Sequence, residues 1–285
     1  MSRLIIIAGP TAVGKTAYAV ELAQKLGTEI VSCDSRQFYR ELKIGVARPT
    51  DDEQAAARHH YVACRSVSEP YDVYRFGADA RKTIARLFES HDTVIAAGGS
   101  GLYIQALTGS IAAMPDPAPG LRDELKQRLR DEGLESLRRQ LQQLDPDYYA
   151  RVDLANPARI QRALEVCLTT GRPYSELLRQ PVEQPPFEVD ATVLTADTDT
   201  LRQRIDSRVD AMMAAGLKEE VEGLLPLRHL NTLNTVGYRE LMAAADGTIS
   251  LDKAVSDIKI NTWHYAKKQL TWLRKYMKTA RWISH

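Results

Sequence analysis

The residues best suited to chemistry lie near the N-terminus, in the stretch Gly9-Pro10-Thr11-Ala12-Val13-Gly14-Lys15-Thr16. This stretch has the spacing G-x-x-x-x-G-K-[S/T] of a phosphate-binding P-loop. Glycines let backbone N–H groups converge on phosphate oxygens, and the dipole of a following helix adds positive potential. Lys15 would contribute a charge, and Thr16 a hydroxyl for Mg²⁺. The stretch predicts a site for a diphosphate or triphosphate, with Mg²⁺ as cofactor.

The surrounding sequence predicts the elements that such a loop needs. An apolar, β-rich run at 4–8 precedes it, and apolar residues follow at helical spacing as far as Gly27, a C-cap residue type. Strands and helices then alternate, which predicts an α/β fold: a P-loop NTPase-like parallel sheet wound with helices. The further strands are expected at 29–33, 93–97 and 191–195, and the helices at 76–88, 102–107, 201–225, 236–245 and 251–276.

A second domain is indicated by a change in composition. Proline-rich junctions at 114–120 and 181–186 bracket the segment 121–178, whose leucines recur only at helical spacing. We therefore expect an all-helical insertion domain at 116–186. The P-loop catalytic core would consist of residues 1–115 and 187–285.

The composition of the whole chain excludes several classes of protein. Its 285 residues are 44% apolar, enough for a core, and no run of 18 apolar residues predicts a membrane span. The chain enters its first strand too early for a signal peptide. The three cysteines lack paired spacing, which argues against disulfides and zinc. We expect a cytoplasmic monomer.

Charge is distributed unevenly along a chain of net charge +1. The segment 258–285 carries seven Lys/Arg residues and no acidic residue, and it contains all three tryptophans, Trp263, Trp272 and Trp282. Such a segment could contact phosphates and stack on bases. Tryptophans bracketing an amphipathic helix are more often core residues, so both interpretations stay open.

Asp34 is the acidic residue expected nearest the P-loop. It follows the strand at 29–33, and adjacent strand ends of a parallel sheet share the ligand-binding edge. In most P-loop NTPases a different strand ends in the acid that organises Mg²⁺, whereas the strand at 93–97 ends in glycines. From its position alone, Asp34 could act in catalysis, bind a metal, or cap a helix.

Several motifs occur together in a characteristic order: the P-loop, Asp34-Ser35-x-Gln37-x-Tyr39, Gly98-Gly99-Ser100-Gly101-Leu102-Tyr103, a helix from Arg204 through Arg208 to Val221, and Val236-Gly237-Tyr238-Arg239. The set resembles the bacterial tRNA dimethylallyltransferases, or tRNA isopentenyltransferases, from residue 3 to about residue 275. Two positions depart from the family pattern, since Val46 and Ser100 stand where threonine is common. Ser100 keeps a hydroxyl, but Val46 does not.

The resemblance implies transfer of a dimethylallyl group from dimethylallyl diphosphate to N6 of the adenosine 3′-adjacent to the anticodon (position 37) of tRNA, with release of diphosphate. Asp34 would be the general base, and Arg208 would clamp the diphosphate together with Lys15. Arg204, on the same helical face as Arg208, would also bind the diphosphate. Thr11 would hydrogen-bond nearby. The acceptor base would flip out of its stack.

The resemblance also implies a surface for the anticodon stem-loop of tRNA. Gln37 would pair with an adenine edge, and without the resemblance Arg159 and Arg162 would be read equally well as an exposed helix face. The implied tRNA-binding residues are Asp34, Ser35, Arg36, Gln37, Ser100, Arg122, Ala158, Arg159, Ile160, Gln161, Arg162, Asn234, Thr235, Val236, Gly237, Tyr238 and Arg239.

Three other functions share parts of this pattern. An isopentenyltransferase acting on free AMP, ADP or ATP would use the same core, but it would not need a helical insertion. A small-molecule kinase would use the P-loop for ATP, against which the glycines after 93–97 argue. A nucleotide-dependent RNA-binding module would leave an acid such as Asp34 beside the P-loop without a role.

Overall fold

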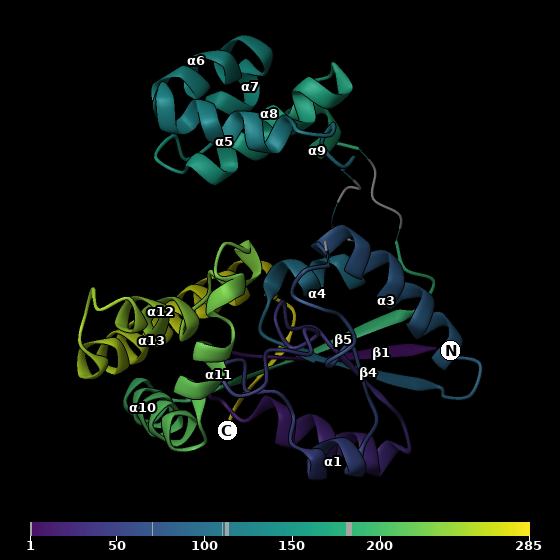
Figure 1. Ribbon diagram of the computed structural model, residues 1–285. Coiled ribbons are helices and arrows are strands. Elements are labelled where there is room, and N and C mark those ends of the chain that lie inside the picture. The colour runs from purple at the N-terminus through teal and green to yellow at the C-terminus, as the bar shows by residue number, and fades with distance from the viewer. Residues whose placement is uncertain (1, 70, 110, 112–113, 181–183) are drawn as a thin grey trace. The chain divides into compact units, whose positions relative to one another are not determined.

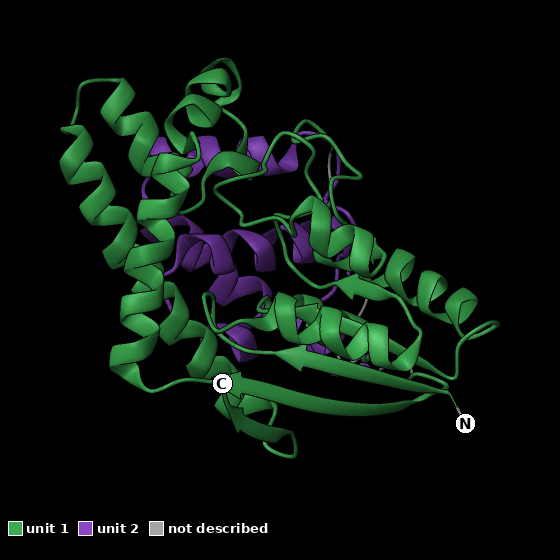
Figure 2. Cartoon of the chain, turned by 90° about the horizontal axis from the view of Figure 1, so that it is seen from below, with its two compact units in different colours: residues 1–108, 185–285 green, residues 109–184 purple. Residues whose placement is uncertain are grey.

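The computed structural model describes residues 2–69, 71–109, 111, 114–180 and 184–285. They divide into two compact units (Figure 2). The first consists of Met1–Thr108 and Pro185–His285, and the second of Gly109–Gln184. Residues 181–183 of the second expected proline-rich junction lie outside the described residues. No helix within the described ranges is long and apolar enough to cross a membrane.

The first unit is built on a parallel sheet, as the sequence predicted. Its six strands lie in the order β3-β2-β4-β1-β5-β6, and each neighbouring pair is parallel. Apolar residues of the central strands, such as Leu4 and Ile7, are fully buried. All carboxyl ends therefore meet at one edge. The strands are β1 Arg3–Ala8, β2 Ile30–Ser32, β3 His59–His60, β4 Thr93–Gly98, β5 Glu188–Thr195 and β6 Arg281–Ser284.

Helices cover both faces of this sheet. In Figure 1, α1 lies on one face, and α3 and α4 lie on the other. Ile205 and Ala266, from α10 and α13, extend the core on the α1 side. The helices of this unit are α1 Lys15–Leu26, α2 Asp51–Ala56, α3 Val73–Leu87, α4 Gly101–Leu107, α10 Thr198–Ala214, α11 Leu217–Gly223, α12 Tyr238–Ala245 and α13 Leu251–Tyr276, with 3₁₀ turns at Leu225–Leu227 and Asn231–Leu233.

The second unit is helical throughout its described elements and has a core of its own. Leu125, Leu137, Leu141 and Leu164 are fully buried in that core. Asp145 caps α7 and also accepts hydrogen bonds from the backbone and hydroxyl of Ser175, which ties α9 to α7. The helices are α5 Leu121–Asp131, α6 Leu134–Leu144, α7 Pro146–Tyr149, α8 Pro157–Thr170 and α9 Tyr174–Leu178.

Four features differ from the expectation. The polar stretch after residue 49 contains α2, which begins with a capping box at Thr50, and the short strand β3. The helix expected at 201–225 is interrupted at Gly216, whose φ of 97° ends α10 and starts α11. The chain then finishes in a sixth strand, β6, that periodicity did not predict.

The tryptophans of the basic segment have three different environments. Trp263 is partly buried against the sheet core. Trp272 lies against Gly101, where an added Cβ would come within 2.3 Å of the indole, and it stacks on Tyr276. Trp282 is exposed on the edge strand β6. The core interpretation therefore fits Trp263 and Trp272 in part, since both are partly buried, and it does not fit Trp282.

Candidate active site

The P-loop leaves β1 at Ala8 and turns into α1 at Lys15. Gly9 is required by close packing, because a Cβ there would lie 2.7 Å from the carbonyl oxygen of Leu194. Gly14 has φ 95°, a conformation that favours glycine. Ala12 also has a positive φ, of 64°, which is uncommon for a residue with a side chain and is concentrated at functional sites.

Lys15 is folded back onto its own loop. Its Nζ donates a hydrogen bond to the carbonyl oxygen of Pro10 at 2.6 Å. Burial, and next the positive charge of Arg208, lower the pKa of Lys15 to about 7, although Asp34 partly opposes the shift. A bound anion would favour the charged form of Lys15. This environment therefore suits a lysine that becomes fully charged when a phosphate ligand binds.

Arg208 faces the P-loop from α10. Its Nη1 donates to Oγ1 of Thr11 at 3.2 Å, and burial lowers the pKa of the guanidinium. Arg204 lies one turn earlier, is exposed, and donates from Nη1 to the carbonyl oxygen of His285 at 3.1 Å. Both arginines line the same cavity as Lys15. Lys15, Arg204, Arg208 and Thr11 thus all line this cavity.

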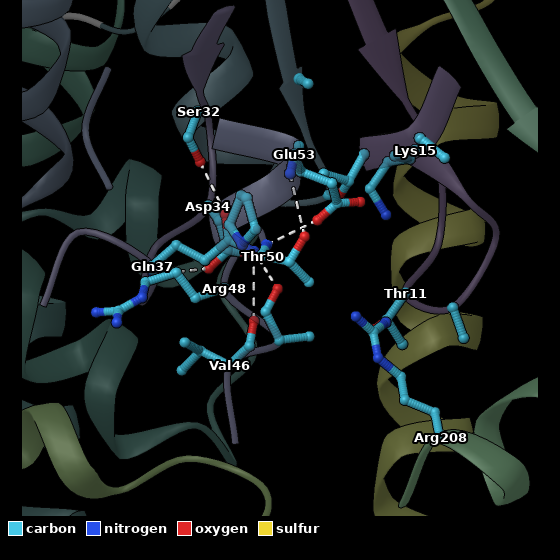
Figure 3. Close-up of a pocket in the computed structure, with 18 of the residues that line it drawn as sticks. Thr11, Lys15, Ser32, Asp34, Gln37, Val46, Arg48, Thr50, Glu53 and Arg208 are labelled. Carbon is cyan, nitrogen blue, oxygen red and sulfur yellow. Dashed lines mark hydrogen bonds between the residues drawn. The ribbon is translucent and has the colours of Figure 1, made fainter. Parts of the chain in front are cut away.

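The cavity above the P-loop has a volume of about 710 Å³. Figure 3 shows Lys15, Thr11 and Arg208 on one side of it and Asp34, Gln37 and Val46 on the other. Thr16 also lines it. The carboxyl ends of β1 and β2 therefore bring the predicted phosphate site and Asp34 to one place.

A second, smaller cavity of about 240 Å³ adjoins the first. It contains Ser35 and Arg36 beside Asp34, and Thr235, Val236 and Gly237 from the turn before α12. Part of the expected tRNA-binding set thus lies next to the expected base. The two cavities share the seven residues Thr11, Asp34, Val46, Ala47, Arg208, Met212 and Tyr265.

Asp34 is half-buried; its carboxylate accepts hydrogen bonds from the backbone and also lines the cavities. Its Oδ1 accepts from the backbone N–H groups of Arg36, at 2.8 Å, and Gln37, at 3.3 Å. The carboxylate therefore caps the turn after β2; the helix that one interpretation of the sequence expected it to cap is not present at 35–40. It also lines both cavities, so it stays available to a ligand. The adjacent N–H of Ser35 donates to Oγ of Ser100 at 3.2 Å, which fixes the turn to the start of α4.

Gln37 is engaged within the protein. Its Oε1 accepts from Oγ of Ser32, and its Nε2 donates to the carbonyl oxygens of Val46 and Ala47. The amide therefore supports the loop that forms one wall of the cavities. Val46 contributes its carbonyl to this contact, so the missing threonine hydroxyl does not remove the loop's attachment. Pairing of Gln37 with an adenine stays a prediction and would require these bonds to change.

Sequence reasoning missed two residues that organise the site. Gln269 of α13 accepts from the N–H of Thr11 at 2.8 Å and donates to the carbonyl oxygen of Gly99 at 2.9 Å, so it joins the P-loop to the end of β4. Glu220 of α11 accepts from the consecutive N–H groups of Lys43, Ile44 and Gly45. Glu220 stood in the helix motif, whereas Gln269 had no local signal.

Two expected tRNA contacts must be corrected. Ile160 is fully buried among leucines of the second unit. Tyr238 is fully buried in the first unit, where its hydroxyl donates to Glu220 at 2.5 Å. Neither side chain can reach an RNA molecule. The burial reflects their positions on the inner faces of α8 and α12, which a contiguous motif does not distinguish from the outer faces.

The other expected residues of the second unit separate into two groups. Ala158 and Arg159 are exposed at the start of α8, and Gln161 is half-buried. Arg122 and Arg162 both pair with the buried carboxylate of Glu165, at 2.8 and 3.1 Å. The Arg122 side chain is 55% exposed although it pairs with Glu165. Asn234 and Arg239 are exposed in the first unit.

Comparison with known proteins matches the family model of IPP transferase to residues 37–276. The chain belongs to the IPP transferase family. It is 45% identical over 272 residues to the tRNA dimethylallyltransferase of Christiangramia forsetii, covering 95% of this chain and 90% of that protein. It is also similar to the crystal structure of a tRNA isopentenylpyrophosphate transferase from Bacillus halodurans, with 32% identity, a TM-score of 0.73, and coverage of 100% of this chain and 90% of that one.

A third comparison concerns the fold alone. A crystal structure of a eukaryotic dimethylallyltransferase acting on tRNA is 24% identical, with a TM-score of 0.83, and the match covers 100% of this chain and 74% of that one. Membership of the family confirms the resemblance inferred from the motifs, and it makes the chain a transferase. The residues assigned to each role remain predictions.

The Glu220 contact gives a prediction about stability. Tyr238→Phe removes a hydroxyl that donates to a carboxylate but keeps the ring that packs against Gly45. We expect the free energy of unfolding to fall by about 1.5–3 kcal/mol, the usual contribution of a hydrogen bond to a charged group. Urea denaturation would measure it. An unchanged midpoint and slope would show that the bond contributes nothing to folding.

Proposed function

We propose that the chain transfers the dimethylallyl group of dimethylallyl diphosphate to N6 of the adenosine on the 3′ side of the anticodon in tRNA. The observation that carries the proposal is the junction between the two cavities, which Arg208, Thr11 and Asp34 all line. A donor held by its diphosphate would present its allylic carbon there, opposite a base. The names of the C. forsetii and B. halodurans relatives support tRNA as the acceptor.

The leaving group determines the chemistry of the first cavity. As the bond between C1 and the diphosphate oxygen breaks, negative charge accumulates on the diphosphate. Arg208 and the N–H groups at the start of α1 would stabilise that charge, and Lys15 would join them by leaving the carbonyl oxygen of Pro10. The rate enhancement would come mainly from this preorganised positive potential.

The acceptor determines the chemistry of the second cavity. The N6 amine forms a bond to C1 while the C1–O bond breaks, and it must then lose a proton. Asp34 would accept this proton as general base, and its Oδ1 contacts with the turn would hold the carboxylate in place. The products are the N6-dimethylallyl adenosine, diphosphate and a proton.

A magnesium ion fits the residues of the first cavity as a ligand shared with the substrate. Within the described residues no group of three or more His, Cys, Asp or Glu side chains could hold a metal. Mg²⁺ usually keeps several waters and is bound by substrate phosphates together with one or two carboxylates, so Thr16 of the first cavity would supply one protein oxygen beside the substrate phosphates. When bound, the ion would neutralise part of the charge on the diphosphate.

The proposal is tested by following a radiolabelled dimethylallyl group. The protein is incubated with labelled donor and, in separate reactions, unmodified tRNA, AMP or ATP. Label in tRNA alone is the expected result. Label in the free nucleotides instead would identify an adenylate isopentenyltransferase. Absence of transfer in every reaction, with ATP consumed when small-molecule acceptors are added, would favour a kinase.

The second unit provides a prediction about tRNA. We expect that replacing residues 109–184 with a flexible Gly/Ser linker weakens tRNA binding at least about tenfold, because phosphate contacts from arginines such as Arg159 dominate affinity. Binding of diphosphate, measured by calorimetry, should be retained, since its cavity lies within the first unit. Equal tRNA affinity with and without the helical unit would show that it is not an RNA-binding arm.

The same prediction can be tested without a deletion. Arg159→Glu reverses one exposed charge on the full chain and should weaken tRNA binding and flatten its dependence on salt. Glu135→Arg, on the exposed part of α6 in the same unit, reverses a charge in the opposite sense and serves as the control.

A further inference from the structure

We propose that Met212 sets the length of the prenyl group that the enzyme accepts, a proposal that rests on the transferase function above. Met212 lies four residues after Arg208 on α10, hence on the same face and one turn along the helix. It lines both cavities, as Arg208 does. A hydrocarbon chain attached to a diphosphate at Arg208 therefore has to pass Met212.

The second cavity, which Met212 lines, is small and has an apolar part beside its polar groups. The second cavity, of about 240 Å³, is below the roughly 300–1,000 Å³ usual for ligand pockets. Its apolar lining comes from Val209, Leu217, Val236 and Ile258. Because an acceptor base must also approach Asp34 in this cavity, little volume is left for a second isoprene unit.

The loop that carries Val46 forms another wall of both cavities and is held firmly. Val46 lines both cavities, and β-branching limits its side-chain rotamers. Its loop is fixed from two sides, by Glu220 at the N–H groups of 43–45 and by Gln37 at the carbonyls of 46–47. The loop therefore cannot easily withdraw, and Met212 becomes the side chain whose size decides how much room the hydrocarbon has.

The decisive experiment compares two donors, dimethylallyl diphosphate and geranyl diphosphate, with unmodified tRNA as acceptor. For either donor the C1–O bond breaks, N6 bonds to C1, the amine proton leaves to the base, and diphosphate is released. In Met212→Ala the ratio of kcat/KM for geranyl to that for dimethylallyl should rise by about tenfold to 100-fold, the range that small changes in an apolar pocket provide. Met212→Phe should lower the use of both donors.

Met213→Ala is the matched control. Met213 is the next residue of α10 and is also partly buried, but it packs against the core and lines neither cavity. Its donor ratio should equal that of wild type. A ratio in Met212→Ala that matches wild type and the control would overturn the proposal.

Two further measurements separate this proposal from the proposed function. Calorimetric binding of geranyl thiodiphosphate, which reacts slowly, reports the room at Met212 even in a variant with poor turnover. Tighter binding to Met212→Ala than to wild type supports the proposal that Met212 limits prenyl length, and equal binding overturns it. Inorganic diphosphate should bind both proteins equally. Failure of wild type to transfer dimethylallyl to tRNA would instead contradict the proposed function.

Discussion

Asp34→Asn is expected to slow single-turnover transfer to tRNA by about 10²–10⁴, the usual contribution of a general base. The structure indicates that this substitution changes the charge of residue 34 without disturbing the turn around it. Asparagine keeps the Oδ1 that accepts from the N–H groups of Arg36 and Gln37, so the turn after β2 should persist. It removes the negative charge and the capacity to take a proton. The melting temperature and the affinity for tRNA should therefore stay close to those of wild type.

Magnesium separates the possible roles of Asp34. If the carboxylate helps to hold the metal, raising the magnesium concentration should partly restore the rate of Asp34→Asn. If it only caps the turn, asparagine caps nearly as well, and the rate should stay within about threefold of wild type. That last result, together with normal donor binding, would remove Asp34 from the catalytic step.

The part of the site closest to the sheet could be predicted because its signals are local. The P-loop pattern, the strand before it and the helix after it all occur within about 25 residues. Asp34 follows another strand, and parallel strands bring their carboxyl ends together whatever lies between them. The proximity of Asp34 to Lys15 was therefore predictable without knowledge of the rest of the chain.

Other parts of the site depend on contacts between distant segments. Gln269 reaches the P-loop across 258 positions of sequence, and Glu220 reaches the 43–45 loop across about 175. Gln269 does not differ in type from the polar residues around it, and the motif that contains Glu220 does not show that its carboxylate points into the protein. For Tyr238 the motif led to the expectation of a tRNA contact, whereas its side chain is buried in the core. A motif identifies positions that matter, but burial decides whether they touch the substrate.

Local signals also explain which fold elements were missed. Gly216 is a residue type that often ends a helix, and the sequence therefore did contain the break between α10 and α11. The apolar spacing on both sides of it masked that signal. The strands β3 and β6 have two and four residues, too few to show a period of two. They are strands because an existing sheet edge pairs with them.

Lys15→Ala is expected to reduce transfer by about 10²–10³, the usual effect of removing one group that stabilises a developing negative charge. Lys15→Met keeps most of the apolar stem without the charge. It should reduce transfer as much as Lys15→Ala does if the loss comes from the missing charge and not from lost packing. Both variants should bind inorganic diphosphate more weakly than wild type. Donor KM and kcat equal to those of wild type would remove Lys15 from the mechanism.

The pH dependence provides a sharper test of Lys15, because its pKa is lowered to about 7 by burial and then by Arg208. In the unfolded chain a lysine keeps its proton up to about pH 10.4. Between these values the unfolded state binds more protons than the folded state, so Lys15 makes stability rise with pH across this window. Lys15→Met should lose that component, visible as a flatter plot of unfolding free energy against pH.

The affinity for diphosphate should change with pH in the opposite direction to stability. The anion favours charged Lys15, so above about pH 7 the free protein must take up a proton to bind it, and affinity should decline by up to about tenfold per pH unit. Diphosphate also titrates, but it does so equally for every variant. The difference between wild type and Lys15→Met therefore isolates the lysine. Parallel curves for the two proteins between pH 6.5 and about 9 would show that Lys15 is already charged before the ligand binds.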